Sequence, residues 1–367
     1  QVSRESPTGR TPARPLPDRS VVHGVEFVEF AADERRAEGL AATLRTLGFR
    51  KAGRHRSKSV DLHRQGQVNI VVNTEQQGQA RSAFLAHGTA AYAIGLQVDD
   101  AQATLARAVA LGAEPFAQDP NPGEIRLPGI RGIGGSVIYF IDRSAELVRL
   151  WEHEFVNVAD ATPSTDAGLE RIDHVAQTMF VDELLTSLLF YTSLFDVRKL
   201  PMVDVVDPGG LVRSQVIENE TGGLRLTLNG AENRRTLAGR FVSELFGAGI
   251  QHIAFASRDM HRTAQALAAN GFEPLRVSPN YYADLATRFG LPAADIAALQ
   301  SAGILYDRDA GGEFLKLYGR TGEDGFFFEV VERRGYAGYG AFNAPFRIAA
   351  QKRHLAPLTL PRPEERE

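Results

Sequence analysis

An internal repeat narrows the possible folds of this sequence more than any other feature. The segment 259–274, DMHRTAQALAANGFEP, resembles 100–115, DAQATLARAVALGAEP. The apolar run 326–333, FFFEVVER, likewise resembles 137–143, VIYFIDR. Because a helix-like and a strand-like segment recur in the same order at a distance of roughly 150 residues, the chain is expected to contain two similar halves of α+β structure.

Residue patterns place strands and helices within each half. Residues 21–32 alternate as a half-buried strand does, and Asp33 is positioned to cap the helix that follows. Asp99 and Asp100 begin a second helix, and the apolar run 181–195 predicts a third. Further strands are expected at 64–73, 90–98, 136–143, 171–180, 223–229, 249–257 and 326–333.

Composition divides the chain into five segments. They are a Pro-rich linker at 1–20, a first half at 21–157, a turn-rich linker at 158–170, a second half at 171–350 and a disordered tail at 351–367. The first segment is rich in proline and arginine and begins with Gln1 rather than Met. This favours a fragment of a longer polypeptide, although an ordinary disordered terminus that has lost its Met fits the same residues.

Charge and cysteine content exclude several classes of function. The chain carries 41 Lys and Arg against 45 Asp and Glu, so neither a nucleic acid nor a membrane surface is expected as its partner. No apolar run reaches the roughly 18 residues of a membrane-spanning helix. The sequence has no cysteine, which excludes disulfides, thiolate nucleophiles and cysteine-held metal clusters. Any metal must therefore be held by His, Asp or Glu.

The repeat also permits a comparison of the two halves position by position. Three potential metal ligands lie in apolar, strand-like runs of the second half: His174, His252 and Glu329. Their counterparts in the first half are expected to be Gly24, Ala93 and Tyr139. This asymmetry points to a metal site in the second half alone.

Two imidazoles and one carboxylate together suit a divalent metal. A buried carboxylate is costly without a counter-charge, and one cation would satisfy all three side chains. The same set forms the facial triad of non-haem iron(II) oxygenases, which leaves positions open for substrate and dioxygen. Iron(II) is the first choice, but manganese, cobalt and magnesium also accept these ligands. The alternative is that each histidine is a hydrogen-bonded core residue.

Other polar and aromatic residues give weaker signals. Seven histidines show no partner at ligand spacing and are expected to be structural or exposed: His23, His55, His63, His87, His153, His261 and His354. The run 54–58, RHRSK, predicts a solvated loop, and the glycine-rich run 129–135 predicts a turn. Trp151 is interpreted as a packing residue.

Residues next to the expected ligands leave their roles open. Arg171 and Asp173 precede His174 and are either supports of the metal site or surface residues. Gln251 precedes His252 in a strand, so its side chain is expected to point away from the metal. No residue beyond the three ligands is assigned a role at the metal, and the catalytic residues stay unknown.

Several of these segments resemble 4-hydroxyphenylpyruvate dioxygenase, a member of the vicinal oxygen chelate superfamily. They include GVEFVEFAA, LPGIRGIGGSVIYFIDR, IDHV, GIQHIAF, GILYDRD and FFFEVVERRG, in the family's order between about residues 21 and 350. The resemblance implies a fold of repeated βαβββ modules in which the second half binds iron(II). The positions that match the family's iron ligands are His174, His252 and Glu329.

The substrate pocket departs from that family. The substrate-pocket candidates are Ser214, Asn229, Lys316 and Asn343. Lys316 replaces a glutamine of the family, and its ammonium could pair with a carboxylate on a different ligand. Leu237 and Ala344 replace a second glutamine and an aromatic residue, and losing the aromatic face would cost about 1–3 kcal/mol in binding a phenol ring. The resemblance implies a retained metal and an altered pocket.

A narrower resemblance is to the C-terminal half of bacterial fusion proteins. It is carried by RTLAGRFVSELFGAGIQH, NYYADL and FFFEVVERRGYAGYGAFNAPFRIAAQ. In those proteins a sugar-phosphate-isomerase-like barrel, which converts 3-dehydroshikimate to protocatechuate, precedes a dioxygenase-like domain. The resemblance implies part of a lyase of quinate, shikimate and aromatic compound catabolism. It implies the upstream barrel as a partner, a small aromatic or 2-oxo acid ligand, and a cytoplasmic homo-oligomer.

Two other functions fit the same residues. One is a free-standing iron(II)-dependent 4-hydroxyphenylpyruvate dioxygenase that forms homogentisate. The other is a metal-binding domain with no chemistry of its own, which supports the barrel or an oligomer.

Overall fold

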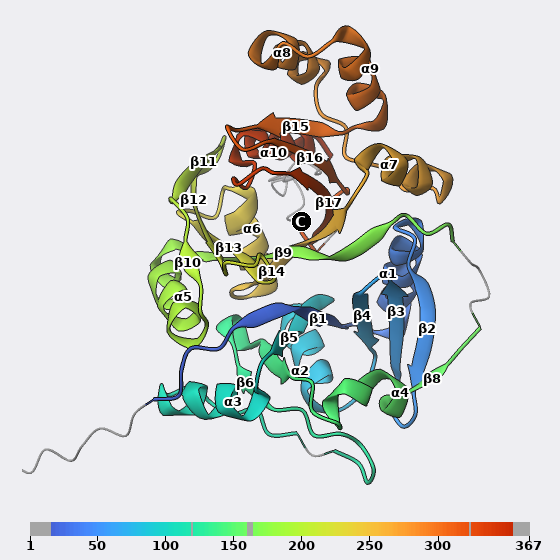
Figure 1. Cartoon of the computed structure of the whole chain (residues 1–367), viewed down its shortest axis with the longest axis vertical. Coiled ribbons are helices and arrows are strands. Elements are labelled where there is room, and N and C mark those ends of the chain that lie inside the picture. The colour runs from blue at the N-terminus through green and yellow to red at the C-terminus, as the bar shows by residue number, and fades with distance from the viewer. Residues whose placement is uncertain (1–15, 119, 160–163, 323, 355–367) are drawn as a thin grey trace, which may run out of the picture.

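The computed structural model describes residues 16–118, 120–159, 164–322 and 324–354. Most of the predicted linker at 1–20 and most of the predicted tail at 351–367 lie outside the described residues. Within them, the chain forms two curled sheets with helices packed around them, in two similar halves (Figure 1). The predicted α+β fold of two similar halves is confirmed.

The first half is built on a sheet of eight described strands in the order β6-β7-β5-β1-β4-β3-β2-β8. Its strands are β1 (Val22–Ala31), β2 (Arg50–His55), β3 (Val60–Gln65), β4 (Val68–Asn73), β5 (Ala90–Val98), β6 (Gly129–Arg131), β7 (Val137–Ile141) and β8 (Phe155–Asn157). Its helices are α1 (Glu34–Thr46), α2 (Gly78–His87), α3 (Ala101–Ala110) and α4 (Leu150–Glu154).

The second half has a sheet in the order β10-β12-β13-β9-β14-β17-β16-β15, with β11 paired to β12. Its strands are β9 (Leu169–Phe180), β10 (Arg198–Lys199), β11 (Val203–Asp207), β12 (Gly210–Glu218), β13 (Arg225–Ala231), β14 (Gly249–Ser257), β15 (Leu305–Arg308), β16 (Glu313–Tyr318) and β17 (Phe327–Arg334). Its helices are α5 (Val181–Leu194), α6 (Leu237–Leu245), α7 (Met260–Ala269), α8 (Pro279–Phe289), α9 (Ala293–Ala302) and α10 (Ala344–His354).

Both sheets follow one plan. β1 pairs parallel with β4 and antiparallel with β5, and β9 pairs in the same way with β13 and β14. Next to them, β5 pairs parallel with β7, as β14 does with β17. The run β1–α1–β2–β3–β4 has the expected βαβββ order. The run from β14 to β17 has it too, with α8 and α9 inserted as a pair that stands beyond the sheet (Figure 1).

Aspartates begin the helices where the sequence predicts them. Asp33 accepts a hydrogen bond from the Arg36 amide at 2.7 Å, and Asp100 accepts one from the Ala103 amide at 2.8 Å. These side chains satisfy amide groups of the first helical turn that have no partner inside the helix. The predicted caps of α1 and α3 are therefore confirmed.

Three predicted boundaries are wrong. Residues 64–73 form the hairpin β3–β4 rather than one strand, because Gly66 adopts a left-handed φ of +55° and turns the chain. The glycine-rich run 129–135 is not all turn, since it starts with the short strand β6. The predicted tail begins too early: residues 351–354 are the last turn of α10.

The strand registers correct one of the three expected counterparts. Gly95 and Ala254 occupy equivalent places, because they pair with Tyr139 and Glu329. On their other side Gly95 pairs with Phe27, whereas Ala254 pairs with His174.

The counterpart of His174 is therefore Phe27 and not Gly24. The two register shifts of β1 recur at the equivalent places of β9, so the two strands align without a gap, and the comparison of the sequences alone was displaced by three residues. The other two expected counterparts, Ala93 and Tyr139, agree with the registers.

One apolar core runs through both halves. Its buried residues come from β1 to β9, from β12 to β17 and from the helices packed on the sheets. Across the contact between the halves, Phe30 packs edge-on against Phe326 at a centroid distance of 5.3 Å, and Phe49 packs against Phe255 at 5.3 Å. Burying such rings stabilises the relative placement of the two sheets.

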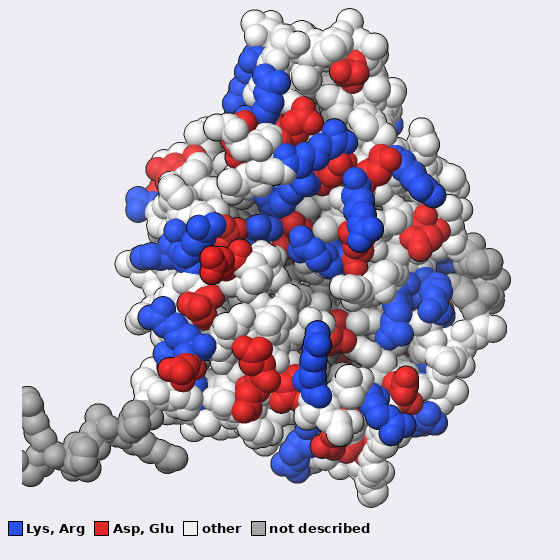
Figure 2. Space-filling model, viewed as in Figure 1, with Lys and Arg blue, Asp and Glu red and all other residues white. Residues whose placement is uncertain are grey.

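The described surface agrees with the charge balance of the sequence. Figure 2 shows positive and negative side chains interspersed over the visible face rather than gathered in one basic surface. Among the helices of the described residues, none combines the length and the apolar character needed to cross a bilayer.

Candidate metal centre

The three expected ligands meet on adjacent strands of the second sheet. His174 lies on β9, His252 on β14 and Glu329 on β17. The two histidine Nε2 atoms are 3.3 Å apart, and Glu329 Oε2 lies 3.9 Å from His174 Nε2 and 3.6 Å from His252 Nε2. Because ligand atoms bind such ions at about 2.0–2.2 Å, two ligands of one ion lie about 3–4 Å apart. The spacing suits a single shared ion.

Burial supports the same conclusion. His174, His252 and Glu329 are 6%, 9% and 1% exposed. The Nδ1 atom of His252 is buried and has no hydrogen-bond partner among the described residues. Burial, together with the electrostatic influence of the neighbouring His174, Arg347 and Lys316, holds the pKa of His252 well below its ordinary value. This imidazole is therefore neutral, which is the form that binds a metal.

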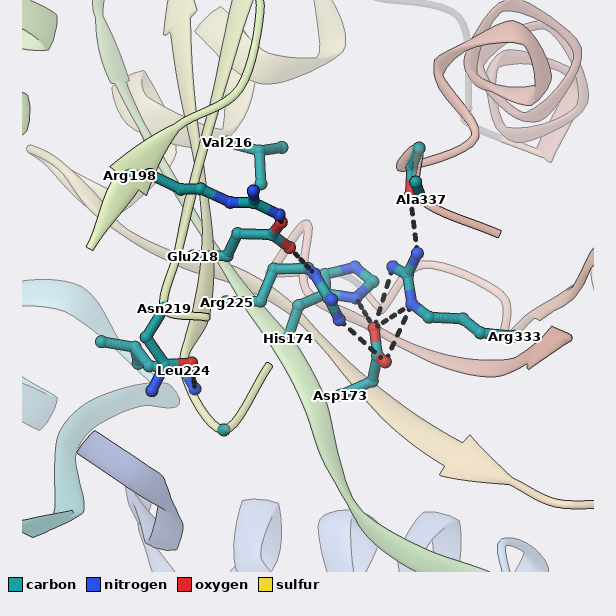
Figure 3. Close-up of polar contacts among 12 residues, drawn as sticks. Asp173, His174, Arg198, Val216, Glu218, Asn219, Leu224, Arg225, Arg333 and Ala337 are labelled. Carbon is teal, nitrogen blue, oxygen red and sulfur yellow. Dashed lines mark hydrogen bonds and ion pairs between the residues drawn. The ribbon is translucent and has the colours of Figure 1, made fainter. Parts of the chain in front are cut away.

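A buried aspartate orients His174 (Figure 3). The Nδ1 atom of His174 lies 2.8 Å from Asp173 Oδ2, so the proton on Nδ1 leaves Nε2 free to face the site. Arg333 and Arg225 donate to the same carboxylate at 3.0 and 3.1 Å. Burial alone would raise the pKa of Asp173, but Arg333, His174 and Arg225 hold it well below its ordinary value.

A chain of ion pairs connects Asp173 with the protein surface (Figure 3). Arg225 also donates to Glu218 at 2.9 Å, and Glu218 accepts from the exposed Arg198 at 2.9 Å. Each buried charge has an opposite neighbour, which buried ions require. Of the two residues whose place was open, Asp173 is 2% exposed and orients the candidate ligand His174, whereas Arg171 is a surface residue.

Lys316 reaches the carboxylate ligand itself. Its Nζ atom lies 2.8 Å from Glu329 Oε1, while Glu329 Oε2 faces the two histidines. Burial alone would lower the pKa of Lys316, but the adjacent Glu329 carboxylate raises it above the ordinary value. The Lys316 ammonium group therefore neutralises part of the Glu329 charge on the side of the carboxylate away from the histidines.

A cavity opens over these ligands. It is lined by three of the four pocket candidates, Ser214, Asn229 and Lys316, and by the two departures from the family pattern, Leu237 and Ala344. Ser214 donates to Asn229 Oδ1 at 2.9 Å, which leaves the Asn229 amide group available to a ligand.

The fourth candidate does not line this cavity. Asn343 is fully buried, and its Oδ1 accepts a hydrogen bond from the Tyr281 hydroxyl at 2.9 Å. It ends the short helical turn Ala341–Asn343, whose first residue, Ala341, does line the cavity.

Gln251 corrects a second expectation. It is the extra residue of a β-bulge between Ile250 and His252, so strict alternation of side chains fails there. Its side chain lines the same cavity as His252 and accepts a hydrogen bond from Thr178 at 2.8 Å. Sequence reasoning also missed Arg347, which lines the cavity with its guanidinium 4.9 Å from the Phe327 ring.

A second His/Glu cluster lies in the first half. Ligand atoms of His55, Glu124 and Glu154 lie within 4.8 Å of one another, so the expectation that His55 has no partner is wrong. The carboxylates are already satisfied: Glu124 pairs with Lys58 at 2.7 Å, and Glu154 accepts from the Ile125 amide at 2.6 Å. The cluster is explained without a metal.

Comparison with known proteins decides the family. Residues 18–156 match the family described as hydroxyphenylpyruvate dioxygenase, N-terminal, and residues 171–312 match the glyoxalase/bleomycin resistance protein/dioxygenase superfamily. A 4-hydroxyphenylpyruvate dioxygenase of Pseudomonas sp. is 32% identical over 330 residues, which cover 87% of this chain and 91% of that protein. The chain belongs to the 4-hydroxyphenylpyruvate dioxygenase family. This family is metal-dependent, and the His/Glu group of the second half is suited to hold the metal.

Two other relatives are much longer than this chain. A 3-dehydroshikimate dehydratase of Pseudomonas aeruginosa is 41% identical over 337 residues, 91% of this chain but 53% of the dehydratase. A solved structure described as a xylose isomerase-like TIM barrel/4-hydroxyphenylpyruvate dioxygenase fusion protein superposes with a TM-score of 0.81 at 39% identity, over 93% of this chain and 54% of that one. The chain spans about half the length of these relatives and corresponds to their dioxygenase-like part.

Proposed function

We propose that this chain is the metal-binding, dioxygenase-like part of a bifunctional 3-dehydroshikimate dehydratase whose lyase barrel lies upstream. The observation that carries the proposal is the 41% identity to dehydratases over 91% of this chain, against 32% to a dioxygenase. His174, His252 and Glu329 would hold one divalent ion, with iron(II) as the first choice. The expected homo-oligomer stays a prediction.

The charges around the cavity favour an anionic ligand. When bound, the divalent ion supplies Lewis acidity to an oxygen ligand such as a carboxylate. Lys316 and Arg347 place two further positive charges on the cavity wall. Asp173 holds the His174 ring in the ligating tautomer, and Asn229 offers a neutral hydrogen-bond donor. A small aromatic acid or 2-oxo acid fits these groups.

A free-standing 4-hydroxyphenylpyruvate dioxygenase is the second candidate. It is favoured by the match to 91% of the length of such an enzyme. The cavity argues against it, because Lys316 is paired with Glu329 and because Leu237 and Ala344 offer neither an amide nor an aromatic face to the substrate.

An oxygen-electrode assay separates the two candidates. With iron(II) and 4-hydroxyphenylpyruvate, the proposal predicts one bound metal per chain but no substrate-dependent oxygen consumption, and no dehydration of 3-dehydroshikimate by this chain alone. Homogentisate formation with robust oxygen uptake would establish the second candidate instead. The reading frame upstream of Gln1 gives an independent test, since the proposal requires it to encode a barrel.

A further inference from the structure

A second and larger cavity lies in the first half, at the place that corresponds to the metal centre. Its volume is about 720 Å³, against about 80 Å³ for the cavity over the metal ligands. Phe27, Tyr92 and Tyr139 line it, and the strand registers place them where the second half has His174, Gln251 and Glu329. Tyr92 and Gln251 are the extra residues of matching β-bulges, which direct both side chains inward.

Aromatic rings form one wall of this cavity. The Phe27 ring lies 5.8 Å from Tyr139 and 5.7 Å, edge-on, from Trp151. Phe116 extends the wall at 5.9 Å from Tyr139, and Phe155 extends it at 5.6 Å from Trp151. The faces of such rings carry negative charge density and attract cations.

The carboxylate of Glu29 also lines the cavity. Glu29 occupies the position of Ala176 in the second half, so the fold does not require an acid there. Tyr92 and Asn73 both donate to its Oε1, at 2.7 and 2.8 Å, and neither bond uses Oε2. Burial raises the pKa of Glu29, which is the cost of placing an acid among aromatic rings.

The charged side chains of the cavity are mainly acidic. Four carboxylates line it, those of Glu29, Glu75, Glu124 and Glu154, against the two cations of Lys58 and Arg131. Lys58 is bound to Glu124 at 2.7 Å, and the Arg131 guanidinium lies over the Phe116 ring at 4.7 Å. Neither cation forms an ion pair with Glu29 among the described residues.

We propose that this cavity binds a small organic cation, an ammonium group on an aromatic or aliphatic body. The ammonium contacts Glu29 Oε2, and the body packs against Phe27, Tyr139 and Trp151. A cation pairs with the Glu29 carboxylate and uses the ring faces, whereas an anion is repelled by Glu29, for which no ion-pair partner is found among the described residues. This site does not depend on the function proposed for the second half.

Trp151 allows the cavity to be tested directly, because it is the only tryptophan of the chain. Titration of the whole chain with benzylammonium is expected to change Trp151 fluorescence saturably. Benzyl alcohol and benzoate, which have the same ring without the positive charge, should bind at least about tenfold more weakly. A panel of cations that leaves the fluorescence unchanged, or benzoate binding as tightly as benzylammonium, overturns the proposal.

Glu29→Gln removes the charge and keeps an acceptor for Tyr92 and Asn73. It is expected to weaken benzylammonium binding by about tenfold or more. The control is Glu38→Gln on the exposed face of α1, which changes net charge equally and should leave binding unchanged. Equal affinity of E29Q and wild type overturns the proposal. If E29Q fails to fold by circular dichroism, Phe116→Leu at the aromatic wall provides the test: weaker binding supports the site and unchanged binding overturns it.

Discussion

The two halves use one strand arrangement for different chemistry. Where the second half places Asp173 beside His174, the first half places Glu26 beside Phe27. Asp173 receives the His174 ring and two arginines. Glu26 instead accepts from the Trp151 indole at 2.6 Å and from a glutamine amide at 2.5 Å. Asp173 therefore orients a candidate metal ligand, and its counterpart Glu26 orients an aromatic ring.

Only a few side chains distinguish the candidate metal centre of the second half from the aromatic wall of the first half. Replacing Phe27 and Tyr139 by His174 and Glu329 exchanges ring packing for buried charge. Buried charge needs compensation, and the second half supplies it with a chain of alternating ions. Ring packing needs none, and the first half has a roomier cavity in which Glu29 lies among aromatic rings.

The largest effect is expected when a candidate metal ligand of the second half is removed. His174→Ala is expected to abolish stoichiometric binding of iron(II) or manganese, because two ligands on separate strands hold an ion poorly. Metal content after dialysis measures the effect. The matched control is Phe27→Leu at the equivalent position, which should keep one ion per chain. An H174A variant that retains one ion would show that the second half has no such centre.

Asp173→Asn should destabilise the fold and loosen the metal. It leaves Arg225 and Arg333 buried beside a neutral amide, at a cost of about 3–5 kcal/mol in the free energy of unfolding. It should also weaken metal binding by about 10–100-fold, as loss of such supports does. Urea unfolding and metal titration provide the two values.

Glu26→Gln is the matched variant of the first half. Its partners Trp151 and Gln97 are neutral, so we expect a cost nearer 1–2 kcal/mol and unchanged metal binding. Equal destabilisation by E26Q and D173N would contradict the distinction drawn between the two carboxylates.

Lys316→Gln should tighten metal binding. The Lys316 ammonium competes for the Glu329 carboxylate and repels a second cation, so its removal is expected to raise affinity by about tenfold. Competition with a chelating dye measures this change. Weaker binding in K316Q would mean instead that Lys316 holds Glu329 in its ligating position.

The smallest expected effect is a pH dependence of folding stability that is caused by Glu29. The second half has Ala176 at the equivalent position and should lack this dependence. Tyr92, Lys58 and Tyr139 face this carboxyl, and burial raises its pKa in the folded chain. The folded state then binds a proton more tightly than the unfolded state, so stability falls as pH rises from about 4 through the folded pKa. The unfolding free energy of wild type should therefore fall relative to that of E29Q over the same pH range. A pH-independent difference would show that Glu29 titrates normally.

Much of the site could be read from local sequence. His174, His252 and Glu329 interrupt apolar runs that the repeat marks as strands, and a polar group in such a run needs a partner. The buried Asp173 carried the same signal within IDHV. Arg333, 160 residues away from Asp173, carried none, because an arginine at a strand end is usually exposed.

By itself, the sequence determined the duplicated α+β fold and the helix caps, because periodicity and capping depend on neighbours along the chain. It also named the three candidate ligands, whose role at a metal stays a prediction. Tertiary structure alone decided that Phe27 stands opposite His174, that Gln251 and Tyr92 turn inward, and that Lys316 pairs with Glu329. Those features depend on β-bulges and on strand registers, and a shift of one residue reverses which side chains face a cavity.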